Sequence, residues 1–432
     1  MCIRDRLHAF FSERQVAKLP EIKDVSPRDI KSIGVIGGGT MGSGIATSAL
    51  LTGLPVTLVE MTQEAADKAS ERILGNLQGA LKRGKLTQSM FENVSDNLLT
   101  ICTDYDSLTN ADIIIEAVFE EMDVKKAVFE KIDAVAKPGA LLASNTSFLD
   151  INEIASSTNR AQDVLGLHFF SPAHVMKLLE VVVGDATQTE VTATGFALGK
   201  RLNKTAVRAG VCDGFIGNRI LMAYRTAADH LLLDGASPFD IDRAIESFGF
   251  AMGPYAVGDL AGLDIEWAYK KRLAPTRHAR ERVPNYSDKL CEAGHFGQKT
   301  GCGHYLYEGR TRQPNPEVLE LIQAERKALG IDPQTFSDND IIARCMAAIV
   351  NEASGVLEEG IARRPLDIDT VLLLGYGFPR YRGGPMKWAD MHGIPAVLAD
   401  IQRFAQDDDY FWQPTKLLQT LAGKNDRFES LN

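Results

Sequence analysis

The sequence is poor in cysteine, and its cysteines are not paired. Six cysteines occur in 432 residues, and no two of them form a C-x-x-C spacing. Structural zinc sites and disulfide frameworks depend on closely spaced cysteines, so the pattern argues against both. We therefore expect no metal site and a protein of a reducing compartment.

Long apolar runs and an excess of basic residues are also missing. No apolar run reaches the roughly 18 residues of a membrane helix, and the N-terminus has no apolar signal core. Lys and Arg number 47 against 57 Asp and Glu, a formal net charge of -10. An acidic chain is a poor partner for phosphate backbones. We expect neither a membrane span nor nucleic-acid binding.

What remains is an ordinary globular composition, 45% hydrophobic and 24% charged, in a chain long enough for two or three domains. The first six residues, MCIRDR, resemble a translated sequencing adapter and are left out of the fold prediction. Residues 7–26 alternate apolar and charged positions at helical spacing until Pro20. We assign residues 1–29 to this artefact and a linker helix.

A glycine-rich loop follows the first apolar strand. Ile33–Ile36 leads into Gly37, Gly39 and Gly42, a G-x-G-x-x-G pattern that opens an apolar helix ending near residue 51. Such glycines permit a tight turn and close approach of the backbone to a pyrophosphate. A second strand over residues 55–60 ends in Glu60, where an acid would bind the adenosine ribose and repel a 2′-phosphate. This predicts NAD binding, against the alternative of a loop that serves packing alone.

Strands and helices alternate through the rest of this region. Further strands are expected at 98–103, 111–119 and 140–144, and helices at 62–88 and 123–137. The pattern predicts a parallel doubly wound sheet, a Rossmann-type α/β domain over residues 30–211. Ligands bind at the carboxyl ends of such strands, where Asn145, Thr146 and Ser147 stand. Those three residues would equally serve as helix caps.

Two apolar runs in GLHFFSPAHVMKLLE carry the predicted chemistry. The run at 164–170 contains His168, Ser171-Pro172 interrupts it, and the run at 176–183 contains Glu180. Two strands joined by a turn would fold back and bring the imidazole to the carboxylate. A carboxylate fixes the tautomer of such an imidazole and prepares it as a proton acceptor. The alternative is a core histidine and a surface glutamate at a strand end.

From Cys212 helical patterns dominate. The segment from Cys212 to Gly235 predicts one long helix. Asn218 lies inside it although asparagine is a poor helix former, so its presence there needs an explanation. Residues 359–394 echo residues 234–263 with an offset of 367 minus 240, or 127. We expect two related all-α domains, at 212–330 and 331–432. Between the repeats, a glycine-rich loop at 294–309 contains Lys299.

These motifs together resemble one family. The segments on which the resemblance rests are IGVIGGGTMGSGIA, ASNTSFLDI, GLHFFSPAHVMKLLEVV, DGFIGNRIL, FGFAMGPYAVGDLAGLD, FGQKTGCGHY and GYGFPRYRGGPM. The chain resembles the NAD-dependent L-3-hydroxyacyl-CoA dehydrogenases, and more closely the dehydrogenase half of multifunctional β-oxidation enzymes of the peroxisomal bifunctional type. The resemblance covers about residue 31 to the last helices. It implies oxidation of an (S)-3-hydroxyacyl-CoA to a 3-ketoacyl-CoA.

The resemblance also implies roles for single residues. His168 matches the catalytic base, Glu180 its partner, and Ser147 and Asn218 the residues beside the substrate. Ser171 stands where many members have Asn, and Glu60 where the family more often has Asp. The implied contacts of NAD are Gly37, Gly39, Thr40, Met41, Gly42, Glu60, Glu120, Lys125, Ser147, Ser171 and Lys299.

Further expectations concern partners and alternatives. The linker helix resembles the one that follows a crotonase-type hydratase module, which the sequence lacks, so no hydratase activity is expected. Acyl-CoA is the expected substrate, and a monomer is favoured over a homodimer because the second repeat could cover the dimer surface. The cytoplasm is expected, or the peroxisome in a eukaryote. The alternatives are a non-catalytic NAD-binding structural protein of the same fold and another two-domain dehydrogenase with a lysine base.

Overall fold

The computed structural model describes residues 3–309 and 311–432, and Cys2 lies outside them. Their contacts divide the chain into two compact units. The sheet unit comprises Leu7–Asn218 and Glu359–Gly375, and the helical unit comprises Arg219–Glu358 and Tyr376–Asn432 together with residues 3–6.

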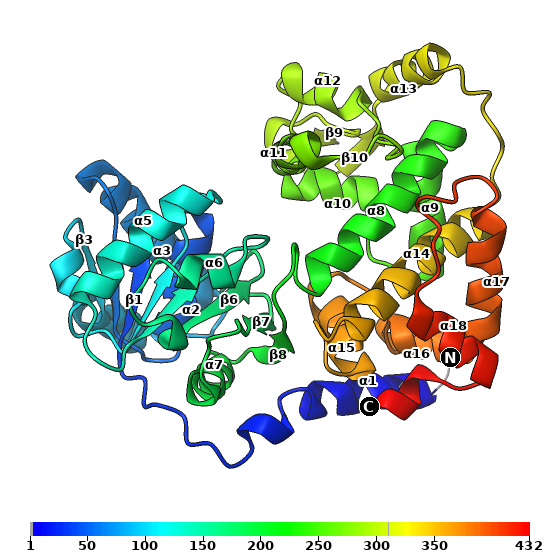
Figure 1. Ribbon diagram of the computed structural model, residues 1–432. Helices are drawn as coiled ribbons and strands as arrows, with labels where there is room; N and C mark the ends of the chain where they lie inside the picture. The colour runs from blue at the N-terminus through cyan, green and yellow to red at the C-terminus, as the bar shows by residue number, and fades with distance from the viewer. Residues whose placement is uncertain (1–2, 310) are drawn as a thin grey trace. The chain divides into compact units, whose positions relative to one another are not determined.

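The sheet unit contains one sheet in the order β3-β2-β1-β4-β5-β6-β7-β8 (Figure 1). The strands β3 to β6 run parallel, β7 is antiparallel to β6, and β8 is parallel to β7. Their bounds are β1 Ile33–Ile36, β2 Val56–Val59, β3 Leu99–Cys102, β4 Ile113–Glu116, β5 Leu141–Ser144, β6 Val164–Phe169, β7 Leu178–Val182 and β8 Thr205–Ala209. The predicted doubly wound sheet is confirmed, including the fold-back of the two runs around Ser171-Pro172.

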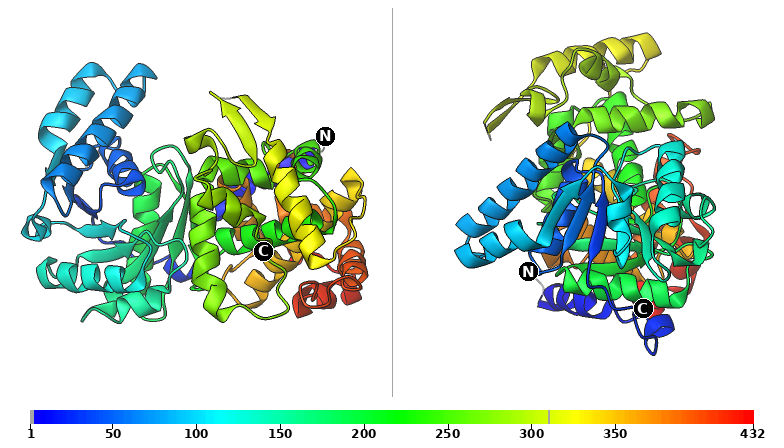
Figure 2. Two further views of the ribbon diagram at one scale, coloured as in Figure 1. Left: turned by 90° about the horizontal axis from the view of Figure 1, so that it is seen from above. Right: turned by 90° about the vertical axis from the view of Figure 1, so that its left-hand side faces the viewer.

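Helices cover both faces of this sheet (Figure 2). The helices α2, α3 and α7 share one apolar core with the strands, whereas α5 and α6 pack on the other face. Their bounds are α2 Thr40–Leu50, α3 Gln63–Lys82, α5 Met122–Val135, α6 Ile151–Ala155 and α7 Thr189–Arg201. The helix α7 and the strand β8 were not recognised in the sequence.

Two expected helices differ at their ends. The helix expected at 62–88 ends at Lys82, since Gly84 takes a left-handed conformation with φ 69°, and a separate helix α4 (Gln88–Asn93) begins after the capping Thr87. The helix expected from Cys212 begins only at Gly217, because Gly214 and Phe215 have φ values of 79° and 52°. Asn218 therefore stands in the first turn of α8 (Gly217–Asp234), where a poor helix former is tolerated.

The helical unit continues α8 and adds a series of helices. They are α9 Pro238–Phe248, α10 Pro254–Ala261, α11 Leu263–Leu273, α12 Tyr286–Glu292, α13 Pro316–Leu329, α14 Asp338–Glu358, α16 Pro385–His392, α17 Ile394–Phe404 and α18 Lys416–Lys424. The expectation of an all-helical region is wrong at one place. A short antiparallel hairpin, β9 (Tyr305–Glu308) and β10 (Thr311–Pro314), interrupts it.

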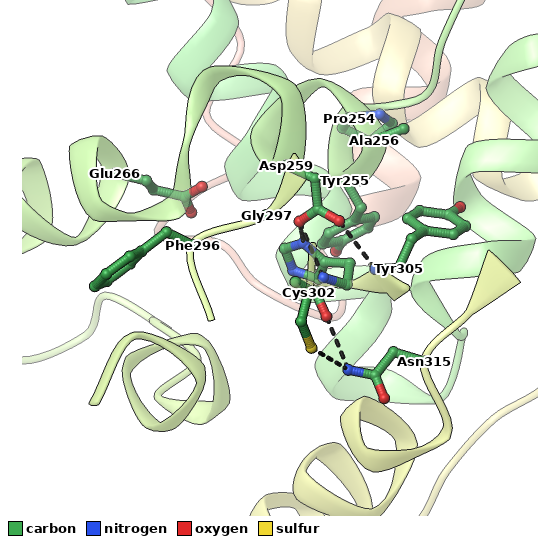
Figure 3. A network of polar contacts seen from close by, with 12 residues as sticks. Pro254, Tyr255, Ala256, Asp259, Glu266, Phe296, Gly297, Cys302, Tyr305 and Asn315 are labelled. Carbon is green, nitrogen blue, oxygen red and sulfur yellow. Dashed lines mark hydrogen bonds and ion pairs between the residues drawn. The ribbon is translucent and has the colours of Figure 1, made fainter. Parts of the chain in front are cut away.

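Buried polar contacts hold this hairpin region against α10 (Figure 3). The Asp259 carboxylate accepts the backbone N–H of His304 and of Tyr305, each at 2.9 Å, and lies 2.8 Å from His304 Nδ1. The Asn315 amide donates to the Gly303 carbonyl at 3.0 Å. His304, one of two histidines flanking the predicted loop, is therefore a buried packing residue.

Part of the second repeat lies in the sheet unit. The helix α15 (Pro365–Gly375) is buried from Pro365 to Leu373 and packs on β7 and β8. The linker helix α1 (Ile3–Gln15) contacts it, with His8 Nε2 2.8 Å from Asp369 Oδ2. Within the described residues, no helix is long and apolar enough to cross a membrane, and no cluster of three or more metal-binding side chains is found.

Candidate active site

The register of β6 and β7 places His168 directly opposite Glu180. Their side chains meet, with His168 Nδ1 2.7 Å from Glu180 Oε2, and both are buried, at 4% and 0% exposure. A carboxylate only accepts hydrogen bonds, so Nδ1 carries the proton and donates it. This leaves Nε2 with a lone pair. The predicted histidine–carboxylate pair is present, and the alternative of a surface glutamate is excluded.

The buried Glu180 charge has a second partner. Its Oε1 accepts the backbone N–H of Gly217, the first residue of α8, at 3.0 Å. Free N–H groups and the helix dipole stabilise a negative charge at a helix N-terminus. The position of α8 thus fixes the carboxylate that orients His168.

Two aromatic rings flank the His168 imidazole. The Phe170 ring lies 4.4 Å from it between centroids and the Phe215 ring 5.8 Å, both tilted. The strand that carries His168 is fixed as well, because the Phe169 N–H donates to Asn145 Oδ1 at 2.9 Å. Asn145 therefore links the end of β5 to β6.

Ser147 and Asn218 are brought together, as the resemblance implies. The Asn218 Nδ2 donates to the Ser147 carbonyl at 3.4 Å. Ser147 follows β5, and His168 lies near the end of the adjacent parallel strand β6. Polar groups from two neighbouring strands thus stand at one edge of the sheet, where ligands of such folds bind.

The glycine loop has the geometry of a phosphate cradle. A Cβ at Gly42 would stand 1.8 Å from the Gly37 carbonyl oxygen, so only glycine allows α2 to approach the loop so closely. A Cβ at Gly39, in contrast, would meet nothing within 4 Å. Thr40 and Met41 form the first turn of α2, whose N–H groups point at the open space beside Gly39.

Glu60 stands beside this loop at the end of β2. Its Oε1 accepts the Gly38 N–H at 2.5 Å and its Oε2 the Met61 N–H at 3.1 Å. Each carboxylate oxygen retains a lone pair for a further donor. The carboxylate is thereby held in place for ribose hydroxyls, which fits the expected dinucleotide.

Glu120 and Lys125 belong to a network that centres on Glu116, a residue that our sequence analysis missed. Glu116 ends β4 and is buried, and Lys125 Nζ donates to both its oxygens, at 2.9 and 3.0 Å. Lys125 also lies 3.3 Å from Glu120. Glu120 in turn accepts the Ser147 N–H at 2.7 Å. Lys125 is buried at 1% exposure, so its ammonium orients Glu120 and the Ser147 loop.

Two further predicted contacts are Ser171 and Lys299. Ser171 is exposed in the connection between β6 and β7, which Lys204 supports by donating to the carbonyls of Ala173 and Met176, the latter at 2.7 Å. Burial, with the nearby Lys85 cation, lowers the pKa of Lys204 to about 8. Lys299 belongs to the helical unit, where it pairs with Asp264.

Two family models match the chain. The model described as "3-hydroxyacyl-CoA dehydrogenase, NAD binding domain" matches residues 32–212. The one described as "3-hydroxyacyl-CoA dehydrogenase, C-terminal domain" matches at two places, 214–307 and 341–429. The second match confirms the internal repeat expected from the sequence.

Known proteins are similar over nearly the whole chain. The peroxisomal bifunctional enzymes of Danio rerio and Homo sapiens are 42% and 41% identical, over 96% of this chain and 60% of each relative. The chain thus spans about three fifths of the length of these relatives. A crystal structure of 3-hydroxybutyryl-CoA dehydrogenase from Escherichia coli K12 is also similar, with 28% identity and a TM-score of 0.77. The match includes 92% of this chain and 99% of the Escherichia coli chain.

A second solved structure is similar over the full length. The dehydrogenase part of multifunctional enzyme 1 from C. elegans covers 96% of each chain, with 27% identity and a TM-score of 0.69. The fold of this chain therefore occurs over nearly its full length in solved structures.

Proposed function

The chain belongs to the 3-hydroxyacyl-CoA dehydrogenase family, and from that membership we propose that it oxidises an (S)-3-hydroxyacyl-CoA reversibly to a 3-ketoacyl-CoA with NAD. The observation that carries the proposal is the buried His168–Glu180 pair at the carboxyl edge of the sheet. Oxidation of an alcohol requires a base for the hydroxyl proton, and this pair supplies one.

We assign the proton transfer to His168. Its Nδ1–H is held by Glu180, so Nε2 takes the proton from the substrate's 3-hydroxyl group. Glu180, stabilised by the α8 N-terminus, then balances the positive charge that develops on the imidazolium. A preorganised charge of this kind lowers the barrier without reorganisation during the reaction. Ser147 and Asn218 hold the substrate oxygen beside His168.

NAD would be held by residues of the sheet unit. Gly37, Gly39 and the first turn of α2 suit the pyrophosphate, and Glu60 suits the adenosine ribose. When bound, NAD supplies the acceptor for the hydride from C3. A carboxylate at Glu60 repels a 2′-phosphate, so NAD is used in preference to NADP.

The finer assignments are proposals as well. The substrate is an acyl-CoA, and a crotonase-type module precedes this segment in the full-length protein, which the 60% coverage of the bifunctional relatives supports. The chain is a monomer. Free cysteines at 102, 212, 291, 302 and 345 and the peroxisomal names of the relatives support a reducing compartment, the peroxisome or the cytoplasm.

The direct test measures NADH formation, by its absorbance, from purified protein with NAD and (S)-3-hydroxybutyryl-CoA, then with a C10 homologue. We expect turnover with NAD and little with NADP. A protein that binds NADH but turns over neither substrate would contradict the proposal and favour a structural NAD-binding protein of this fold.

The role of His168 is tested by His168→Gln. We expect kcat to fall by about 10² to 10⁴, the usual contribution of a positioned base, while the affinity for NADH stays unchanged. The exposed His392 provides a matched control, His392→Gln, with unchanged kcat. Near-normal kcat in His168→Gln would show that another group is the base.

A further inference from the structure

One glycine of the second helical repeat lies beside a ring that packs on His168. Gly375 is the last residue of α15, and a Cβ there would stand 2.7 Å from Leu178 Cδ2 and 3.4 Å from the Phe170 ring. Phe170 lies against the imidazole of His168, with 4.4 Å between ring centroids. The backbone of α15 thus supports the ring that packs on His168.

The internal repeat shows that this glycine is specific to the second copy. The offset of 127 residues pairs Gly375 with 375 minus 127, or position 248, which is Phe248. In the first copy, Phe248 is buried and packs on Phe250 and Phe378, at 6.1 and 6.2 Å between centroids. The helices α9 and α15 both have 11 residues, but α9 ends in the large Phe248 whereas α15 ends in Gly375.

The helix that carries Gly375 is firmly attached to the sheet. Residues just before α15 bond to the edge strand β8, where the Gly210 N–H donates to the Ile361 carbonyl at 2.8 Å. On its other side, His8 of α1 pairs with Asp369. These contacts make α15 a rigid support rather than a mobile cover.

We propose that α15 is part of the catalytic apparatus, with Gly375 and Phe170 as positioning residues for His168. Glu180 fixes the Nδ1 side of the imidazole, but one hydrogen bond leaves rotation about it. The Phe170 ring, held from behind by Gly375, removes that freedom and directs Nε2. The assignment rests on the proposed function, in which His168 is the base.

The main variants are Gly375→Phe, which restores the residue of the first repeat, and Gly375→Ala. In Gly375→Phe, Phe170 must leave its place, and we expect kcat to fall more than 10-fold with an unchanged KM for NAD. In Gly375→Ala the flexible end of Leu178 absorbs part of the overlap, and a loss of two- to five-fold is expected. Adding Leu178→Val removes the overlapping atom and should restore kcat.

A matched control is available in α18. A Cβ at Gly423 would meet nothing within 4 Å, so Gly423→Ala tests the general effect of alanine for glycine in a helix. Its kcat should equal that of the unchanged protein. Equal loss in Gly423→Ala and Gly375→Ala, or no restoration by Leu178→Val, would overturn the proposal.

A second readout does not depend on turnover. The His168 Hε1 resonance, assigned with His168→Gln in histidine-labelled protein, is shifted by the ring current of Phe170. It should move in Gly375→Phe and in Phe170→Leu, and stay in Gly423→Ala. An unmoved resonance in both variants would refute the contact itself. If the unchanged protein lacks dehydrogenase activity, the proposed function fails, while this resonance still reports whether α15 positions the imidazole.

Discussion

Buried charges in this protein are balanced by partners from other elements. Glu180 on β7 is held by His168 on β6 and by the first N–H of α8. Lys125 on α5 is held by Glu116 on β4. Such pairs cost desolvation energy, and removal of one partner leaves an uncompensated charge. Each pair therefore fixes the position of one element relative to another.

His230 in the helical unit predicts a pH dependence of stability. Burial lowers its pKa from 6.5 to about 4, and the Arg282 cation adds to this, while Asp408 and Asp234 act in the opposite direction. The unfolded chain binds a proton near pH 6.5, but the folded protein only near pH 4. Stability from this group is thus fully present above pH 6.5 and is lost as pH falls toward 4.

The measurement is urea unfolding across this pH range. Between pH 6.5 and 4 the unchanged protein should lose on the order of 1–3 kcal/mol more than His230→Gln does. His392→Gln, at an exposed position, should follow the unchanged protein. Parallel curves for all three proteins would contradict the predicted burial of a neutral His230.

At the scale of elements, the join of β1 and α2 separates two uses of glycine. Gly42 is needed for packing, because its Cβ position overlaps the Gly37 carbonyl. Gly39 has an ordinary φ of -63° and open space around it, so nothing in the protein itself requires glycine there. We propose that the requirement at Gly39 comes from the ligand, whose pyrophosphate would approach the backbone.

Alanine substitutions distinguish these uses. Gly42→Ala should lower the free energy of unfolding by on the order of 2–5 kcal/mol, since α2 must move away from the loop. Gly39→Ala should change it by less than about 0.5 kcal/mol, yet weaken NADH binding at least 10-fold. Denaturant unfolding and NADH fluorescence titration measure the two quantities. Unchanged NADH affinity in Gly39→Ala would place the pyrophosphate elsewhere.

At the scale of the whole molecule, residues distant in sequence form one unit. The α1 segment ends against Arg364, whose Nη2 donates to the Val16 carbonyl at 2.9 Å and to Asp367 Oδ1 at 2.7 Å. Asp367 is fully buried. The guanidinium of Arg364 therefore joins the start of the chain to the second repeat, in addition to the pair of His8 and Asp369.

Arg364→Ala tests this connection. Removal of the guanidinium leaves the buried Asp367 carboxylate with fewer hydrogen-bond donors. The Val16 carbonyl, just after α1, loses the donor that holds it. We expect a loss of on the order of 2–4 kcal/mol in the free energy of unfolding. The neighbouring Arg363 is exposed, so Arg363→Ala should be near neutral. Equal stability of both variants would show that α1 is held by its other contacts, including the pair of His8 and Asp369.

Local patterns in the sequence were sufficient for the elements that have a strong period or a strong turn signal. The glycine loop, β1 and the fold-back of β6 and β7 around Ser171-Pro172 were predicted correctly, as was the repeat. The alternation of apolar residues and the residue types of turns are local properties, so they can be recognised in a single sequence. The start of α8 and the hairpin β9–β10 were not, because positive φ values and short strands leave weak signals.

Long-range partners were decided only by the folded chain. The sequence does not reveal that Glu180 meets the N-terminus of α8, because Gly217 follows it by 37 residues. The repeat predicts that α15 resembles α9, but not that α15 packs on the sheet and that Gly375 faces Phe170. Periodicity determines which face of an element is apolar. Which surface covers that face depends on contacts between distant segments, and these exist only in three dimensions.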